Sequence, residues 1–190
     1  MAAINFTLWV VDVVDLTDMK QLELAALLNV NFMQPLVGGS VGSASCRVVG
    51  TAEEFRPGMF DAVVFLTNIS FKGSGSILKR AGVSPEEATL NENLKGLTAT
   101  PLPGGGISEV YWNRCELLSG VAGAIFHEAC HLKFKAKRHN EMHDAVGSDG
   151  KKVWILGTNN MNAAHPNTAD IEVFKSKIPN AVPLRNRLPS

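Results

Sequence analysis

Two histidines and a glutamate stand close together in the segment His127-Glu128-Ala129-Cys130-His131. On an α-helix, residues four apart lie on the same face, so both imidazoles can reach one metal ion. A glutamate directly after the first histidine then lies beside the metal, where its carboxylate can take a proton from water. This spacing predicts a zinc site in which His127 and His131 are ligands and Glu128 is the general base.

The residues around this motif have the pattern of an amphipathic helix. Asn113, followed three positions later by Glu116, is a helix-start signal. An apolar stripe follows at helical spacing, made of Leu118, Val121, Ala122, Ile125, Ala129 and Leu132. His127 and His131 fall roughly opposite this stripe, so we expect them to face a cleft or solvent. Cys130 points away from their metal, and we interpret it as a packing residue.

A third ligand is required, because a catalytic zinc normally has three protein ligands and one open position for water. In an unbroken helix His139 would lie about 12 Å along the axis from His131, too far to share one ion. The chain must therefore turn back. His139 is the ligand if the helix ends early, and His143 if it continues for another turn, which leaves more chain for the return. Asp144 is expected to orient an imidazole, and His165 is a more remote candidate.

The composition is that of one soluble globular domain, residues 1–190. The 18 basic residues balance 18 acidic residues, so no overall field favours nucleic acid or an anionic membrane as a partner. A local basic run after the motif is interpreted as a solvated helix end, where cations suit the helix dipole. This run consists of Lys133, Lys135, Lys137 and Arg138.

The cysteines and the N-terminal residues indicate the cellular compartment in which the protein is expected. Cys46, Cys115 and Cys130 are sparse and odd in number, which argues against a disulfide framework and favours a reducing compartment. Residues 6–14 are apolar, but they lack a basic flank and contain Asp12, so we expect a buried strand there. We therefore expect no membrane-spanning segment, and a protein that is cytoplasmic or released without a Sec signal peptide.

The remaining sequence predicts an α+β arrangement. Residues 61–67 are a continuous apolar run suited to the centre of a sheet, and residues 17–32 have a helical pattern that ends before Pro35. Residues 38–45 and 73–76 are rich in glycine and serine and are interpreted as loops. The apolar residues of the helical pattern are Leu22, Ala25, Ala26 and Leu28. Further elements are expected at residues 4–14, 47–51 and 107–112 (strands) and from Ser84 (a short helix).

The order of these elements resembles that of the zincin metallopeptidases, and within them the metzincin group. Residues 157–162 resemble the methionine turn that lies beneath the metal in metzincins, with Met161 in the place of the methionine. Residues 107–112 resemble the edge strand that pairs with an extended peptide substrate through its main chain. The residues of that substrate strand are Ile107, Glu109 and Tyr111.

The resemblance covers most of the chain as an order of elements, and its specific motif is the HExxH segment. It departs from metzincins at Phe134, where those proteins have a glycine that turns the chain at once toward the third ligand. It implies an α+β, zincin-like single domain. In that fold a twisted mixed sheet carries the active-site helix, and a closing C-terminal helix lies at residues 167–178.

The resemblance also implies an activity. The protein would be a zinc metalloprotease, a hydrolase that holds one catalytic Zn²⁺ and cleaves peptide bonds of a peptide or protein substrate, with Glu128 as general base. One alternative is a zinc amidase that acts on cell-wall amides with the same chemistry. Another is a non-catalytic zincin-fold subunit for binding or assembly, with a closed site that uses both His139 and His143.

Overall fold

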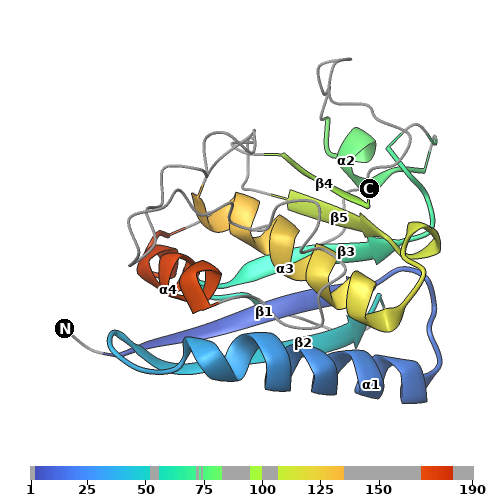
Figure 1. Ribbon diagram of the computed structural model, residues 1–190. Helices are drawn as coiled ribbons and strands as arrows, with labels where there is room; N and C mark the ends of the chain where they lie inside the picture. The colour runs from blue at the N-terminus through green and yellow to red at the C-terminus, as the bar shows by residue number, and fades with distance from the viewer. Residues whose placement is uncertain are drawn as a thin grey trace.

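The computed structural model describes residues 3–51, 56–71, 73, 75–82, 95–99, 107–134 and 168–181. Within these ranges five strands form one mixed sheet in the order β2-β1-β3-β5-β4 (Figure 1). The strands are β1 (Ile4–Asp12), β2 (Val41–Gly50), β3 (Ala62–Thr67), β4 (Gly96–Ala99) and β5 (Ile107–Tyr111). Strands β1, β2, β3 and β5 run parallel, whereas β4 is antiparallel to β5. The expected α+β class with a mixed sheet is confirmed.

Helices pack on both faces of the sheet (Figure 1). They are α1 (Asp18–Leu28), α2 (Ile77–Arg80), α3 (Leu118–Phe134) and α4 (Thr168–Lys177). The larger core lies between the sheet and α1, α3 and α4, and the smaller core lies on the opposite face with α2. Successive residues of β1 serve the two cores, because Leu8 and Val10 face the larger one and Trp9 and Val11 the smaller. None of the described helices is long and apolar enough to cross a membrane.

The strands follow the sequence prediction except at β2 and at β4, which the sequence did not predict. Strands β1, β3 and β5 lie where they are expected. β2 begins at Val41, so the prediction of a loop over residues 38–45 is wrong from that residue onward. The reason is the parallel ladder with β1, in which Ser43 pairs with Asn5. Main-chain hydrogen bonds hold this edge strand, so its small polar side chains can face solvent.

Two predicted helices are confirmed, as α1 and as the closing helix α4. At the start of α1 the Thr17 hydroxyl accepts a hydrogen bond from the main-chain N–H of Lys20. Beyond α1 the chain continues through a π-helical turn (Asn29–Met33) and a 3-10 turn (Gln34–Leu36). Helical winding therefore extends past Pro35, since the first turn of a helix tolerates proline.

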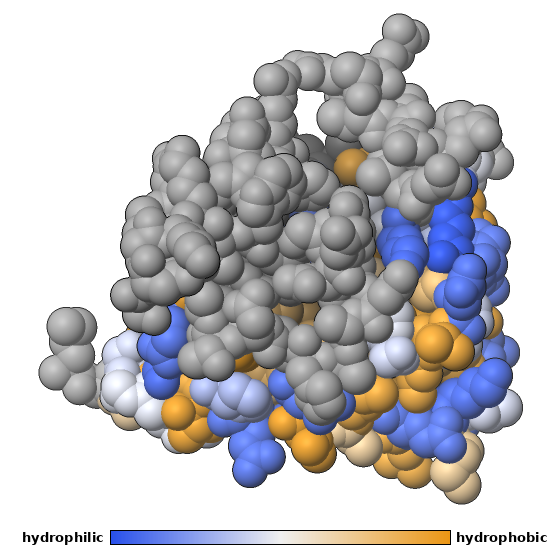
Figure 2. Space-filling model, in the orientation of Figure 1, coloured by the Kyte–Doolittle hydropathy of each residue, from blue (hydrophilic) through white to orange (hydrophobic). Residues whose placement is uncertain are grey.

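The apolar side chains of α1 divide between two faces. Leu24 and Leu28 are fully buried in the larger core. Leu22 is 66% exposed, and with Met19 and Val30 it forms an apolar outer surface on this segment. Figure 2 shows orange patches interspersed with blue ones along the lower edge of the molecule, where α1 lies. The sequence pattern predicted the helix correctly but did not distinguish its two faces, because leucines occur on both.

α3 begins later than the sequence predicts and is enclosed on all sides. Asn113 does not cap it but lies in a 3-10 turn (Trp112–Arg114), where its Nδ2 donates to the Asn68 carbonyl at 3.3 Å. Every residue from 120 to 133 is buried, so the histidine face does not look onto solvent. Cys130 packs in the larger core, as predicted. The predicted stripe also packs against this core, through Leu118, Val121, Ala122, Ile125, Ala129 and Leu132.

The prediction of a solvated basic helix end is wrong at Lys133. Its side chain is fully buried, and Nζ donates to the carbonyl oxygens of Phe60 at 2.8 Å and Asn180 at 2.6 Å. The Asn180 side-chain amide in turn donates to the Lys133 carbonyl at 3.1 Å. These bonds tie the end of α3 to the segment before β3 and to the residues after α4.

Replacing this ammonium group should loosen the C-terminal end of α3. We expect Lys133→Met to lower the free energy of unfolding by about 2–4 kcal/mol, because two carbonyl oxygens lose their charged donor. Urea unfolding followed by circular dichroism measures the change. Lys20→Met, at an exposed position of α1, is the control and should stay within about 1 kcal/mol. Equal free energies of unfolding for the two variants would show that the Lys133 hydrogen bonds do not stabilise the fold.

Candidate metal centre

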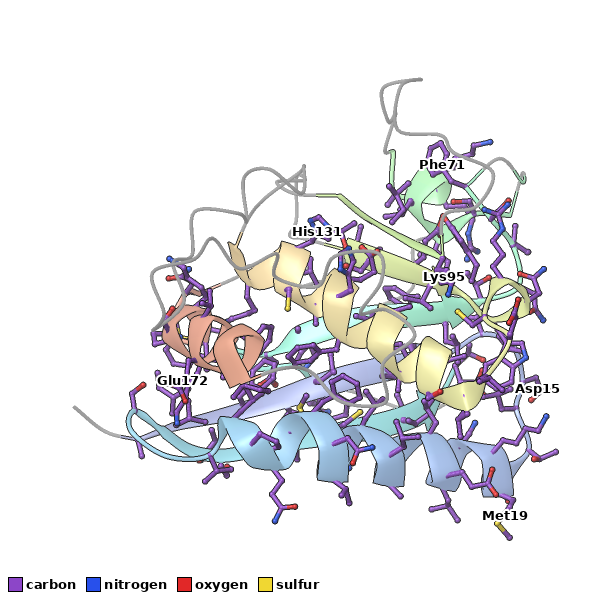
Figure 3. All side chains as sticks on the ribbon, viewed as in Figure 1. Asp15, Met19, Phe71, Lys95, His131 and Glu172 are labelled. Atoms are coloured by element: carbon purple, nitrogen blue, oxygen red, sulfur yellow. The ribbon has the colours of Figure 1, made fainter. Side chains whose placement is uncertain are left out.

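His127 and His131 lie on successive turns of α3 with their rings close together. Their Nε2 atoms are 3.1 Å apart, and the ring planes meet at 76°. The two side chains are only 2% and 6% exposed. In Figure 3, His131 extends from α3 on the side of the helix where β4 lies. The two nitrogens therefore converge on one buried position, as the i, i+4 spacing predicts.

The separation of these nitrogens fits two ligands of one zinc ion. Zinc–nitrogen bonds of about 2.0–2.1 Å at a tetrahedral angle place two ligand nitrogens about 3.3 Å apart. The same separation also fits a hydrogen bond between a protonated and an unprotonated Nε2, so the pair can stay together without metal. Imidazole nitrogen is a preferred zinc donor, and the residues present fit the ion.

The expected third ligand falls outside the described residues. Within the described ranges, no group of three His, Cys, Asp or Glu side chains converges on a common metal position. His139 and His143, the two predicted candidates, lie outside the described residues, as do Asp144, His165 and Met161. Their assigned roles stay predictions.

Glu128 is held against the two strands at one edge of the sheet. The Thr98 hydroxyl of β4 hydrogen bonds to Glu128 Oε2, and Thr98 Oγ1 also lies 3.2 Å from the Glu128 carbonyl oxygen. Ser108 of β5 is the register partner of Thr98, and their hydroxyl oxygens are 2.6 Å apart. Only 4% of Glu128 is exposed. The glutamate thus joins α3 to both β4 and β5.

Gly96 of β4 leaves the space that the Glu128 side chain occupies. A Cβ atom at this position would lie 2.8 Å from both Cγ and Oε1 of Glu128, and 3.0 Å from the Glu109 carbonyl oxygen. The first two distances are shorter than ordinary contacts between these atoms, so a side chain here would displace the carboxyl group. The absence of a side chain at Gly96 therefore allows β4 to approach α3 this closely.

The surroundings of Glu128 favour its neutral form. Burial raises the pKa of its carboxyl group from 4.5 to about 8, the hydrogen bond from Thr98 lowers it, and the negative charge of Glu109 raises it further. A positive charge beside the carboxyl group would favour the carboxylate, which is the form that acts as a base. A cation bound by the adjacent histidines would supply that charge.

The prediction that β5 is a substrate edge strand is wrong. β5 is paired on both sides, with β3 and β4, so its main chain has no free edge. Ile107 and Tyr111 pack in the smaller core, on the face of the sheet opposite α3, and Glu109 points to that same face. Within the described residues the edge strand beside α3 is β4. The sequence did not predict β4, because four residues are too few to establish an alternating pattern.

Glu109 is a buried structural carboxylate. It accepts hydrogen bonds from the Ser76 hydroxyl at 3.0 Å, the N–H groups of Ile77 and Leu78 at 3.1 and 3.3 Å, and the Tyr111 hydroxyl at 2.7 Å. Burial raises the pKa of Glu109, and these hydrogen bonds lower it. The group fixes the start of α2 against β5. The prediction of a surface loop is therefore wrong at Ser76, which is buried and caps α2.

The sequence did not predict three residues that contact Glu128, which are Gly96, Thr98 and Ser108. Gly96 and Thr98 belong to the unpredicted β4, so nothing in the sequence placed them near α3. Only Ser108 could have been suspected from the sequence. It lies in a predicted strand, and a hydroxyl group that is buried there needs a polar partner.

Comparison with known proteins finds no matching family model, and no curated protein or solved structure of significant similarity. The functional inference therefore rests on the geometry of the site.

The raised pKa of Glu128 predicts a pH-dependent stability in chelator-treated protein. Between about pH 4.5 and pH 8 the folded state keeps a proton that the unfolded state has lost. The free energy of unfolding should therefore fall as pH rises through this window, by up to about 1.4 kcal/mol per pH unit, and level off above it. Glu128→Gln has no such proton to lose, so it should gain stability relative to the wild-type protein as pH rises.

Urea unfolding at pH 5, 7 and 9 measures this difference. Glu23→Gln, an exposed change on α1, serves as the control and should follow the wild-type protein at all three values. Parallel curves for Glu128→Gln and the wild-type protein would show that the carboxyl group is not desolvated.

Proposed function

We propose that this protein is a zinc-dependent peptide-bond hydrolase with a zincin-like fold. The observation that carries the proposal is the 3.1 Å separation of the His127 and His131 Nε2 atoms, next to a buried glutamate. The mixed sheet with a helix across its β4–β5 edge supports a zincin-like arrangement. In this proposal the third ligand is His139 or His143, and Met161 lies in a turn beneath the metal.

The residues of the chain have distinct tasks in this reaction. His127 and His131 would hold the ion by Nε2. A bound zinc ion would supply Lewis-acid chemistry, lowering the pKa of water and polarising the scissile carbonyl. Glu128 removes a proton from the attacking water and delivers it to the leaving amine nitrogen. Burial of the site keeps bulk water away and strengthens these electrostatic interactions.

The substrate is proposed to bind as an extended chain along β4. Among the described residues β4 pairs with β5 alone, and the substrate would pair with the other main-chain edge of β4. Gly96 and Thr98 of β4 contact Glu128, so a peptide on that edge would lie near the carboxyl group. Recognition through the main chain suits a protease with peptide or protein substrates.

Burial of both histidines also supports a second candidate, a structural zinc site in a binding or assembly subunit. A closed site has four protein ligands and no water position, and side chains that are 2% and 6% exposed suit it. In this case both His139 and His143 would be ligands. The buried Glu128 argues against it, because a closed site has no use for a carboxyl group that costs free energy to bury.

Metal analysis of the purified protein tests the proposal. We expect about one zinc per chain by elemental mass spectrometry, lost in His127→Ala and in only one of His139→Ala and His143→Ala. His165→Ala is the matched control and should keep its zinc. Loss of zinc in both His139→Ala and His143→Ala would instead support the closed site, and absence of zinc after reconstitution would refute both candidates.

The role of Glu128 is tested by hydrolysis of unfolded protein, mixed peptides and cell-wall amides. Glu128→Gln should retain zinc and lose turnover by about 10²–10⁴-fold, since it removes the general base without removing a ligand. Turnover that is unchanged in this variant would remove Glu128 from the mechanism. Cleavage of the cell-wall amides alone would identify an amidase in place of a protease.

A further inference from the structure

A pair of hydroxyl groups lies between Glu128 and the sheet. Thr98 and Ser108 are register partners on β4 and β5, and both side chains point to the face that carries α3. Their oxygens are 2.6 Å apart, and each also lies within hydrogen-bond distance of the Glu128 carbonyl oxygen, at 3.2 and 3.4 Å. The Thr98 hydroxyl contacts Glu128 Oε2 in addition.

The number of hydrogens fixes the direction of these bonds. Each hydroxyl has one hydrogen to donate. The Thr98 hydrogen goes to Glu128 Oε2 whenever the glutamate is ionised, because a bond to a charged acceptor is the strongest available. Thr98 Oγ1 is then an acceptor for the Ser108 hydroxyl at 2.6 Å, which is a better bond than the 3.4 Å alternative. The chain of donors runs from Ser108 through Thr98 to Glu128.

The two carboxyl oxygens of Glu128 therefore differ. Oε2 receives a hydrogen bond from Thr98. Oε1 lies beside Gly96, where the missing side chain leaves it space, and none of the described residues donates to it. A hydrogen bond to Oε2 opposes protonation at that oxygen and directs an incoming proton to Oε1.

We propose that Thr98 is a positioning residue for Glu128, which fixes Oε2 and leaves Oε1 as the oxygen that transfers the proton. This inference rests on the proposed hydrolase function. The water O–H bond breaks, the proton bonds to Oε1, and the electron pair stays on the attacking oxygen. The same proton then passes from Oε1 to the leaving nitrogen. Oε2 accepts from Thr98 before and after each transfer, so the carboxyl group need not rotate.

Thr98→Val and Thr98→Ser form a matched pair, since valine keeps the shape of threonine without the hydroxyl and serine keeps the hydroxyl. We expect Thr98→Val to lower kcat about 10- to 100-fold with KM and zinc content unchanged, which is the loss of one hydrogen bond to a charged group. Thr98→Ser should recover most of the rate. Ser108→Ala should have a smaller effect, because it acts on Glu128 through Thr98.

A second measurement does not depend on activity or metal. The carboxyl stretching band of Glu128, identified by infrared difference against Glu128→Gln in chelator-treated protein, should shift in Thr98→Val and return in Thr98→Ser. An unshifted band and full kcat in Thr98→Val would overturn the role of Thr98 while the hydrolase function stands. An inactive, zinc-free wild-type protein would overturn that function, and the band would still decide whether Thr98 holds Oε2.

Discussion

The contact between the Glu128 carboxyl group and β4 constrains the rest of the site. Burying a carboxyl group costs free energy that is recovered only through close polar partners. Thr98 supplies the hydrogen bond and Gly96 supplies the space, so α3 cannot shift along β4 without losing both. Because His127 precedes Glu128 on the same helix, this contact also fixes the direction in which the histidine pair faces.

Two buried glutamates on opposite sides of the sheet differ in the number of hydrogen bonds that they accept. Glu109 accepts hydrogen bonds from four groups, which include the N–H groups at the start of α2. The Glu128 carboxyl accepts from Thr98 alone among the described residues, and burial raises its pKa to about 8. A carboxyl group with so few donors is suited to exchange a proton, whereas one with four donors is suited to hold a fold together.

Local patterns predicted the elements well and the contacts between them poorly. The apolar run at residues 61–67 and the histidine spacing on α3 are properties of neighbouring residues, so both were correct. β4 was missed because a four-residue strand has no periodicity to detect. Lys133 was placed in solvent because its two carbonyl partners, on Phe60 and Asn180, are remote in sequence.

The sequence by itself determined that two imidazoles lie on one helical face with a glutamate beside them, because the 3.6-residue repeat of a helix fixes that arrangement. It also determined that residues 61–67 suit the centre of a sheet, because they form a continuous apolar run. Only the tertiary structure decided that β5 is internal, that β4 forms the edge, and that Thr98 and Gly96 meet Glu128. Strand pairing joins segments through main-chain hydrogen bonds, which every residue except proline can donate, so side-chain patterns carry little information about it.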